Sequence, residues 1–422
     1  MNFNFYEVLL PIALILSLSK LLEIGFRKIN IPQVIAMLLA GVLIGLVNYI
    51  PNQEILLPSG VAGIGFIAKI GVILIMYSAG LETDVKKIKE CGVSSLVITL
   101  LGVVVPMGLG FIVATLFNGG FSALSDHKTL MTNLFYGTIL TATSVSVSVA
   151  TLKEVNKLDT KVGTSIISAA ILDDILGIII LSFVSSMSGD GSSDAGILSK
   201  VLTKAMGENL SSLAVIISVV LFFAFIVGLG ILIRMLFTYL NNKYDHQRRI
   251  PIFGIAVCFF FAYMSERLFG VADITGAYFA GLFLSSTRDT GYIDHRSEVL
   301  GYMIFTPVFF ANIGISMQFE AIDVNMLFFG ITFVIAGILG KLLGCSLGSL
   351  ICKFNLKDSF RIGVGMMARA EVCLICAQKG IDAGLVNKGI LPFILIMIIF
   401  SSFITPLILK QSYKGELSLQ WK

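Results

Sequence analysis

The chain has 422 residues, of which 56% are hydrophobic and 13% are charged, and its formal net charge is +4. Its mean hydropathy is +0.93, whereas soluble domains carry about 25% charged residues. So much apolar surface cannot be buried in a single soluble core, which excludes an ordinary soluble protein. The composition predicts a polytopic membrane protein embedded in a lipid bilayer.

Thirteen apolar segments are long enough, or nearly so, to cross a bilayer as helices. In chain order they lie at residues 5–25, 31–47, 60–80, 92–118, 129–151, 161–186, 208–240, 250–268, 272–286, 298–317, 325–353, 359–379 and 387–411. The sequence therefore predicts an all-α membrane protein with about 13 transmembrane helices.

The distribution of Lys and Arg predicts the orientation of these helices. If the N-terminus lies outside, the inner loops hold 20 Lys and Arg and the outer loops hold 6. Cytoplasmic loops are enriched in these residues, so we expect the N-terminus outside and the C-terminus in the cytoplasm, in the cell (inner) membrane. The net positive charge then reflects topology, and no nucleic-acid partner is needed to explain it.

The order of the segments predicts an internal symmetry. Six segments precede an unusually long seventh, and six more follow it, so the second six enter the membrane from the opposite side. Such inverted-topology repeats are common in secondary transporters. We expect a first six-helix repeat with an outer loop at residues 1–207, a linker helix with an inner loop at 208–249, and a second six-helix repeat at 250–422.

The fifth segment of each half contains a polar interruption. The first reads TATSVSVSVATLKE (141–154), and its β-branched and hydroxylated residues form helix poorly. An unwound stretch there would free carbonyls to coordinate a cation; the alternative is a continuous helix whose Ser and Thr bond back to its own carbonyls. The second, GVGMMARAEVCLICA (363–377), holds Arg369 and Glu371, which indicate either a broken helix or a purely structural ion pair.

Two adjacent carboxylates lie inside the sixth segment, SAAILDDILGIIILSFV (168–184). A charged Asp at the centre of a membrane helix costs about 2.5–3.5 kcal/mol on insertion scales. Neighbouring helical residues point about 100° apart, so Asp173 and Asp174 are expected to have different roles. One can pair with Lys341, near the centre of the eleventh segment, while the other faces a water-filled path.

These charges predict a transport chemistry. Burial brings the charged and neutral forms of Asp and Lys closer in energy, so such groups can exchange protons. A carboxylate also binds a hard cation through oxygen, so that a proton and a cation compete for one site. Competition together with alternating access gives antiport, and no enzymatic step or cofactor is required. A sodium-coupled organic-anion symporter, a channel and an intramembrane enzyme remain as alternatives.

Seven motifs together resemble the monovalent cation/proton antiporters. They are NIPQVIAMLLAGVLIG (30–45), GVILIMYSAGLETD (71–84), TATSVSVSV, ILDDILGIIIL, ITGAYFAGLF (274–283), TPVFFANIGI and GKLLG. The resemblance covers nearly the whole chain in the same order. It is strongest to the bacterial sodium/proton antiporters with paired aspartates and a lysine, which implies a fold with two broken, crossing helices.

The resemblance also implies roles for individual residues. Asp174 would be the main proton carrier and the ligand of the sodium ion, and Thr143 and Ser144 would line the crossing of the broken helices. Asp173 would pair with Lys341 and release it when sodium binds. Arg369 and Glu371 match the charge-pairing residues of an RGE-like element, whose middle residue is Ala370 in this chain.

At the level of the whole protein, the resemblance implies a homodimer in which a mobile core works as an elevator and exchanges sodium or lithium for protons. An exchange of two protons for one sodium would be electrogenic and would serve pH homeostasis. Related potassium/proton antiporters leave potassium as an alternative ion.

Overall fold

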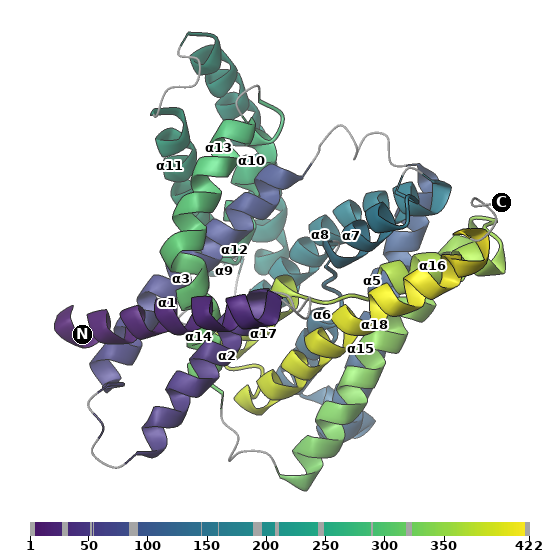
Figure 1. Cartoon of the computed structure of the whole chain (residues 1–422). Coiled ribbons are helices and arrows are strands. Elements are labelled where there is room, and N and C mark those ends of the chain that lie inside the picture. Colours follow the sequence, from purple (N-terminus) through teal and green to yellow (C-terminus); the bar gives the residue numbers. More distant parts are fainter. Residues whose placement is uncertain are drawn as a thin grey trace. The chain divides into compact units, whose positions relative to one another are not determined.

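A computed structural model describes residues 5–27, 33–50, 53, 55–83, 92–144, 146–158, 160–188, 196–206, 211–243, 249–287, 290–317 and 323–417 of the chain. Within these ranges the regular structure is entirely helical, and no strand is present. The predicted all-α class is therefore confirmed. Figure 1 traces the helices in chain order.

Each of the thirteen apolar segments falls on helix in the described residues. Among the described residues, nine helices are long and apolar enough to cross a membrane, and two shorter apolar helices cover Gln33–Gly45 and Asp273–Leu284. The other two segments are each divided into a pair of shorter helices. The chain is a multi-pass membrane protein, and the count of thirteen spans stays a prediction.

Two compact units are each assembled from two separate stretches of chain. Unit 1 comprises Met1–Lys86 and Ser185–Met317, and unit 2 comprises Lys87–Val184 and Gln318–Lys422. The helices of unit 1 are α1 (Phe5–Arg27), α2 (Gln33–Gly45), α3 (Pro58–Glu82), α9 (Ile197–Met206), α10 (Ser211–Lys243), α11 (Arg249–Tyr263), α12 (Asp273–Leu284), α13 (Thr290–Leu300) and α14 (Thr306–Ile315). Short 3₁₀ or π turns cover Leu46–Tyr49, Met264–Phe269 and Gly301–Phe305.

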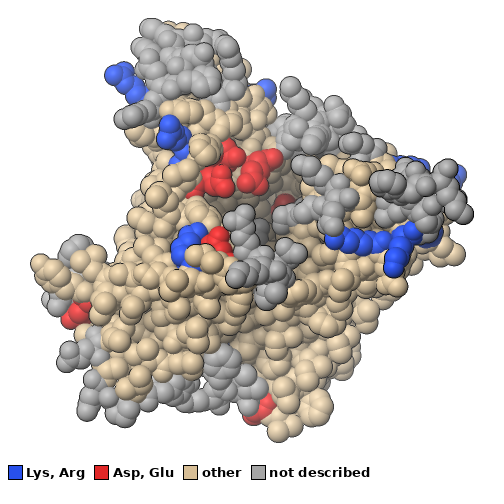
Figure 2. Space-filling model, in the orientation of Figure 1, with Lys and Arg blue, Asp and Glu red and all other residues tan. Residues whose placement is uncertain are grey.

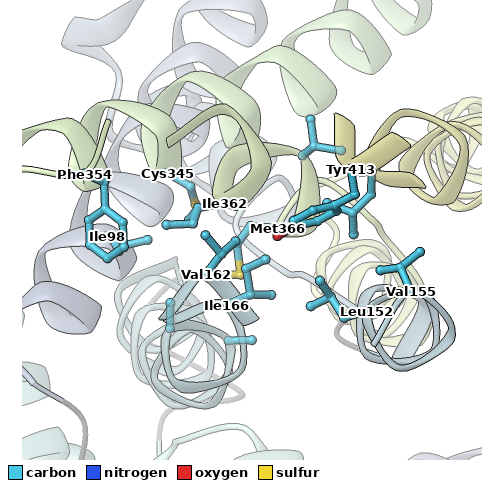
Figure 3. Close-up of a cluster of buried hydrophobic side chains, with 14 residues drawn as sticks. Ile98, Leu152, Val155, Val162, Ile166, Cys345, Phe354, Ile362, Met366 and Tyr413 are labelled. Carbon is cyan, nitrogen blue, oxygen red and sulfur yellow. The ribbon is translucent and has the colours of Figure 1, made fainter. Parts of the chain in front are cut away.

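Unit 2 contains both divided segments. Its helices are α5 (Val93–Phe117), α6 (His127–Ile139), α7 (Ser146–Glu154), α8 (Lys161–Ser188, which runs on into unit 1), α15 (Val324–Ile351), α16 (Leu356–Gly365), α17 (Glu371–Asp382) and α18 (Leu391–Leu417). Short 3₁₀ turns cover Phe121–Ser125 and Lys388–Ile390. Apolar side chains of α5, α7, α8, α15, α16 and α18 meet in one buried cluster, part of which is shown in Figure 3.

The outer surface of the helices matches a lipid environment. Large apolar side chains are exposed along the long helices, for example Val104, Leu232 and Leu347 at 58%, 62% and 49%. In the view of Figure 2 most of the surface that is not grey carries no charged side chain. Surfaces of this kind are stable in a bilayer and would aggregate in water.

Close packing between α5 and α15 depends on glycines. A Cβ on Gly340 would lie 2.7 Å from Cα of Pro106, and a Cβ on Gly348 would lie 2.8 Å from Cα of Ile98. Small residues let membrane helices approach backbone to backbone. This contact fixes α15, and with it Lys341, against α5.

We predict that Gly348→Ala destabilises the protein by about 1–3 kcal/mol, because the added methyl group overpacks the contact with α5. The measurement is thermal unfolding of the purified protein. Gly108→Ala on α5 is the matched control, since a Cβ there meets nothing within 4 Å. Equal melting temperatures for the two variants would contradict the prediction.

Candidate functional site

The first interruption separates α6 from α7. Helix α6 ends at Ile139, α7 begins at Ser146, and the described residues Thr141–Ser144 between them are not helical. All four are buried, with exposures of 5% or less. The polar stretch is therefore unwound inside the protein, where exposed backbone groups need partners.

The second interruption separates α16 from α17. Helix α16 ends at Gly365, α17 begins at Glu371, and Met366–Ala370 between them is also buried and not helical. Of the two residues singled out by sequence, Arg369 lies in this unwound stretch and Glu371 is the first residue of α17. The side chain of Glu371 lies outside the described residues.

The two interrupted segments contact each other through hydrogen bonds to main-chain carbonyls. The N–H of Ser144 donates to the carbonyl of Ala368 at 2.8 Å, and the hydroxyl of Ser148 donates to the carbonyl of Gly365. Helix α18 supports the second stretch, since Ser401 Oγ accepts from the N–H of Arg369 at 3.1 Å and the Ser402 hydroxyl donates to its carbonyl at 3.3 Å. The broken segments therefore cross within unit 2.

Two buried cations bind the carbonyls of Thr141 and Ala142 in the first unwound stretch, and one of them also binds a carbonyl of α15. Nη2 of Arg369 donates to the carbonyl of Gly337 at 2.8 Å, and Nη1 donates to the carbonyl of Ala142. Nζ of Lys341 donates to the carbonyl of Thr141 at 2.8 Å. The C-terminal end of a helix carries partial negative charge, so these cations neutralise the end of α6.

Lys341 also forms an ion pair with Asp173. The distance from Nζ to Oδ1 is 2.5 Å, and the two side chains are 0% and 1% exposed. The second oxygen of Asp173 is buried without a hydrogen-bond partner among the described residues. Such a pair is expensive to desolvate, and removing one member leaves an uncompensated charge.

Asp174 lies one residue further along α8 and differs from Asp173 in its surroundings. It is partly exposed, whereas Asp173 is buried. Thr143, in the first unwound stretch, has a buried hydroxyl with no hydrogen-bond partner among the described residues. Carboxylate, hydroxyl and carbonyl oxygens are the donors that hard cations prefer. Unit 2 therefore holds, on its unwound stretches and on α8, the donor types needed for a small cation.

Sequence reasoning missed several of the residues that hold the crossing. Ser148 is one of three serines in a Ser/Val run, and nothing in that run shows which of them reaches Gly365. Ser401 and Ser402 lie in the apolar α18 and carry no motif. Their presence inside a membrane helix was the only available signal.

Comparison with known proteins finds a family and individual relatives that match nearly the whole chain. The transmembrane model of the sodium/hydrogen exchanger family matches residues 13–414. The Na⁺/H⁺-K⁺ antiporter GerN of Bacillus cereus is 32% identical over 418 residues, which cover 97% of each chain. A Na⁺/H⁺ antiporter of Enterococcus hirae is 32% identical over 393 residues, which cover 91% of this chain and 92% of that protein.

The solved structure of the sodium proton antiporter MjNhaP1 from Methanocaldococcus jannaschii has a similar fold. The TM-score is 0.66 at 18% identity, and the match covers 98% of this chain and 99% of that one. At this level of identity the likeness extends to the fold alone.

We predict that Lys341→Ala lowers the free energy of unfolding by about 3–5 kcal/mol, because it leaves a charged Asp173 buried without its partner. The measurement is thermal or chemical unfolding in detergent. The double variant Asp173→Asn/Lys341→Ala is the control, and it should recover much of the loss since no uncompensated charge remains. If the double variant loses as much unfolding free energy as Lys341→Ala and Asp173→Asn lose in sum, the two side chains do not stabilise each other and the prediction is wrong.

Proposed function

This chain belongs to the sodium/hydrogen exchanger family and is a secondary transporter, not an enzyme, that exchanges monovalent cations for protons; we propose that its cation is sodium or lithium and that its ion site is centred on Asp174. Both bacterial relatives are named as Na⁺/H⁺ antiporters. The name of GerN also includes K⁺, so a potassium/proton antiporter is the second candidate.

The positions of the oxygen-bearing residues in unit 2 support the proposed mechanism. Asp174 is the partly exposed carboxylate of the pair, and it binds either a proton or a cation. Thr143 and Ser144, in the first unwound stretch, supply further oxygens to the cation. A cation and a proton that share one carboxylate exclude each other, which couples their movements. Each direction of transport then carries only one of the two.

The ion pair of Asp173 and Lys341 adds a second proton. When sodium binds, Asp173 turns toward the cation and Lys341 releases a proton. Together with the proton from Asp174, two protons then exchange for one sodium, and net charge crosses the membrane. The observation that supports this role is that Lys341 and Asp173 are fully buried and bound to each other.

The two compact units support an elevator mechanism. Unit 2 holds all of the proposed ion ligands and moves as one body across the membrane, while unit 1 forms the contact of a homodimer. Each unit combines a piece of the first predicted repeat, 1–207, with a piece of the second, 250–422. This division agrees with an inverted repeat joined by a linker at 208–249, of which α10 is the helix.

We expect the protein in proteoliposomes with an imposed pH gradient to dissipate that gradient on addition of Na⁺ or Li⁺, and not K⁺ or choline. A pH-sensitive dye inside the vesicles reports the proton flux. Asp174→Asn should abolish the response, because the amide can no longer exchange a proton. Asp323→Asn is the matched control, since Asp323 caps α15 through the N–H of Met326 and Asn caps helices equally well.

The other outcomes of this assay distinguish between the remaining hypotheses. An equal response to K⁺ would place the protein among potassium/proton antiporters. No response to any cation would favour a sodium-coupled symporter. Full exchange by Asp174→Asn would show that the ion site lies elsewhere.

We predict that Na⁺-driven proton flux is electrogenic. Valinomycin with K⁺ on both sides removes the membrane potential and should accelerate exchange, because two protons cross for each sodium. The control is the same ionophore without Na⁺. A rate that does not depend on the ionophore would show that the cycle is electroneutral.

A further inference from the structure

Three stretches that are distant in sequence meet at one end of unit 2. Leu152 and Val155 from the α7 region, Phe354 and Ile362 from the α15–α16 region, and Tyr413 from α18 belong to one buried cluster. In the view of Figure 3, Ile362 lies between Phe354 on one side and Tyr413, Leu152 and Val155 on the other. Helix α8 begins here at Lys161, α15 ends here at Ile351, and α18 ends near here at Leu417.

Positive charges gather around this cluster. The stretches 151–161, 351–361 and 409–416 together hold eight Lys or Arg and four Asp or Glu. The cations whose side chains are described form what we call the basic face: Lys157, Lys161, Lys353, Lys357, Arg361, Lys410 and Lys414. Figure 2 shows Lys and Arg on the part of unit 2 where Figure 1 labels α16 and marks the C-terminus.

Two aromatic rings of the cluster contact three of these cations. Nζ of Lys161 lies 4.3 Å from the ring centre of Phe354, and Nζ of Lys157 lies 5.8 Å from that of Tyr413. The guanidinium of Arg361 lies 3.8 Å from the same Tyr413 ring. Cation–π contacts of this kind hold the side chains in place.

Arg361 is a buried residue that connects two of the stretches that form the basic face. It is 3% exposed, and it donates to Asp358 Oδ1 at 3.0 Å and to the carbonyl of Ser412 on α18 at 2.7 Å. The residue thereby ties α16 to the end of α18, next to Lys410 and Lys414. We regard Arg361 as a positioning residue for the lysines around it.

Exposed apolar side chains lie on the same stretches of chain as the lysines. Leu356 and Phe360, one turn apart on α16, are 77% and 43% exposed, and Ile351 at the end of α15 is 66% exposed. Three helices long enough to span the membrane end at this level. The basic face therefore lies at the boundary between the hydrocarbon and the lipid headgroups.

We propose that the basic face binds the phosphate-bearing headgroup of an anionic phospholipid, whose acyl chains lie against Ile351, Leu356 and Phe360. Loop lysines alone would set the topology of the chain, but that role needs no convergence of three stretches on aromatic rings. Clustered cations at the membrane surface attract anionic lipids. The site is independent of the ion that the protein transports.

The test is thermal unfolding of the purified full-length chain in detergent with added dioleoylphosphatidylglycerol, dioleoylphosphatidylcholine or glycerol phosphate. We expect phosphatidylglycerol alone to raise the melting temperature in a saturable manner. Lys157→Gln/Lys161→Gln/Lys357→Gln should bind this lipid on the order of 100-fold more weakly, as the loss of three cations near an anionic headgroup implies. The corresponding triple Arg variant should keep the effect.

The matched control is Lys128→Gln/Lys200→Gln/Lys204→Gln, which removes three exposed lysines outside the basic face and should leave the lipid effect unchanged. If the first triple variant does not fold, Lys161→Gln alone should weaken binding about fivefold. Equal stabilisation of the wild type by phosphatidylcholine or by glycerol phosphate would overturn the proposal, as would an unchanged lipid effect in the Gln variants.

Discussion

The proposed ion site depends on two buried cations that bind carbonyls of a broken helix and of α15 beside it. An unwound stretch inside a membrane protein exposes carbonyls that neither water nor lipid can satisfy. Arg369 joins the carbonyls of Ala142 and Gly337, and Lys341 reaches that of Thr141. Without these cations the unwound residues 141–144 would return to helix or let water in, and no oxygen-lined crossing would form.

The ion pair with Lys341 gives the adjacent carboxylates Asp173 and Asp174 different surroundings and therefore different roles. Asp173 completes the charge balance by binding Lys341 at 2.5 Å in a fully buried pair, so it contributes to holding the crossing. Asp174 is partly exposed on the same helix, and this exposure makes it the carboxylate suited to exchange a cation and a proton with water. In the proposed cycle, stability and transport thus depend on neighbouring residues with opposite degrees of burial.

The sequence predicted the helical class, the apolar segments and the places where two helices break, because unpaired charges and runs of Ser and Thr are rare in membrane helices. It also singled out Asp173 and Lys341, since each intramembrane charge needs a partner. It could not show that Arg369 binds carbonyls, because Ala142 and Gly337 offer only main-chain atoms that every residue has. Nor did it predict the ten-residue helix α9, which lies between two of the apolar segments, or the division of the chain into two interleaved units.

Competition between a cation and a proton for one site is the central claim, and counting protons released on cation binding tests it most directly. Titration calorimetry of the purified protein with NaCl, in two buffers that differ in protonation enthalpy, gives the number of protons released per sodium bound. The account predicts proton release by the wild type, approaching two per sodium if Lys341 also gives up its proton, and no sodium binding by Asp174→Asn. Sodium binding that releases no proton would contradict the account.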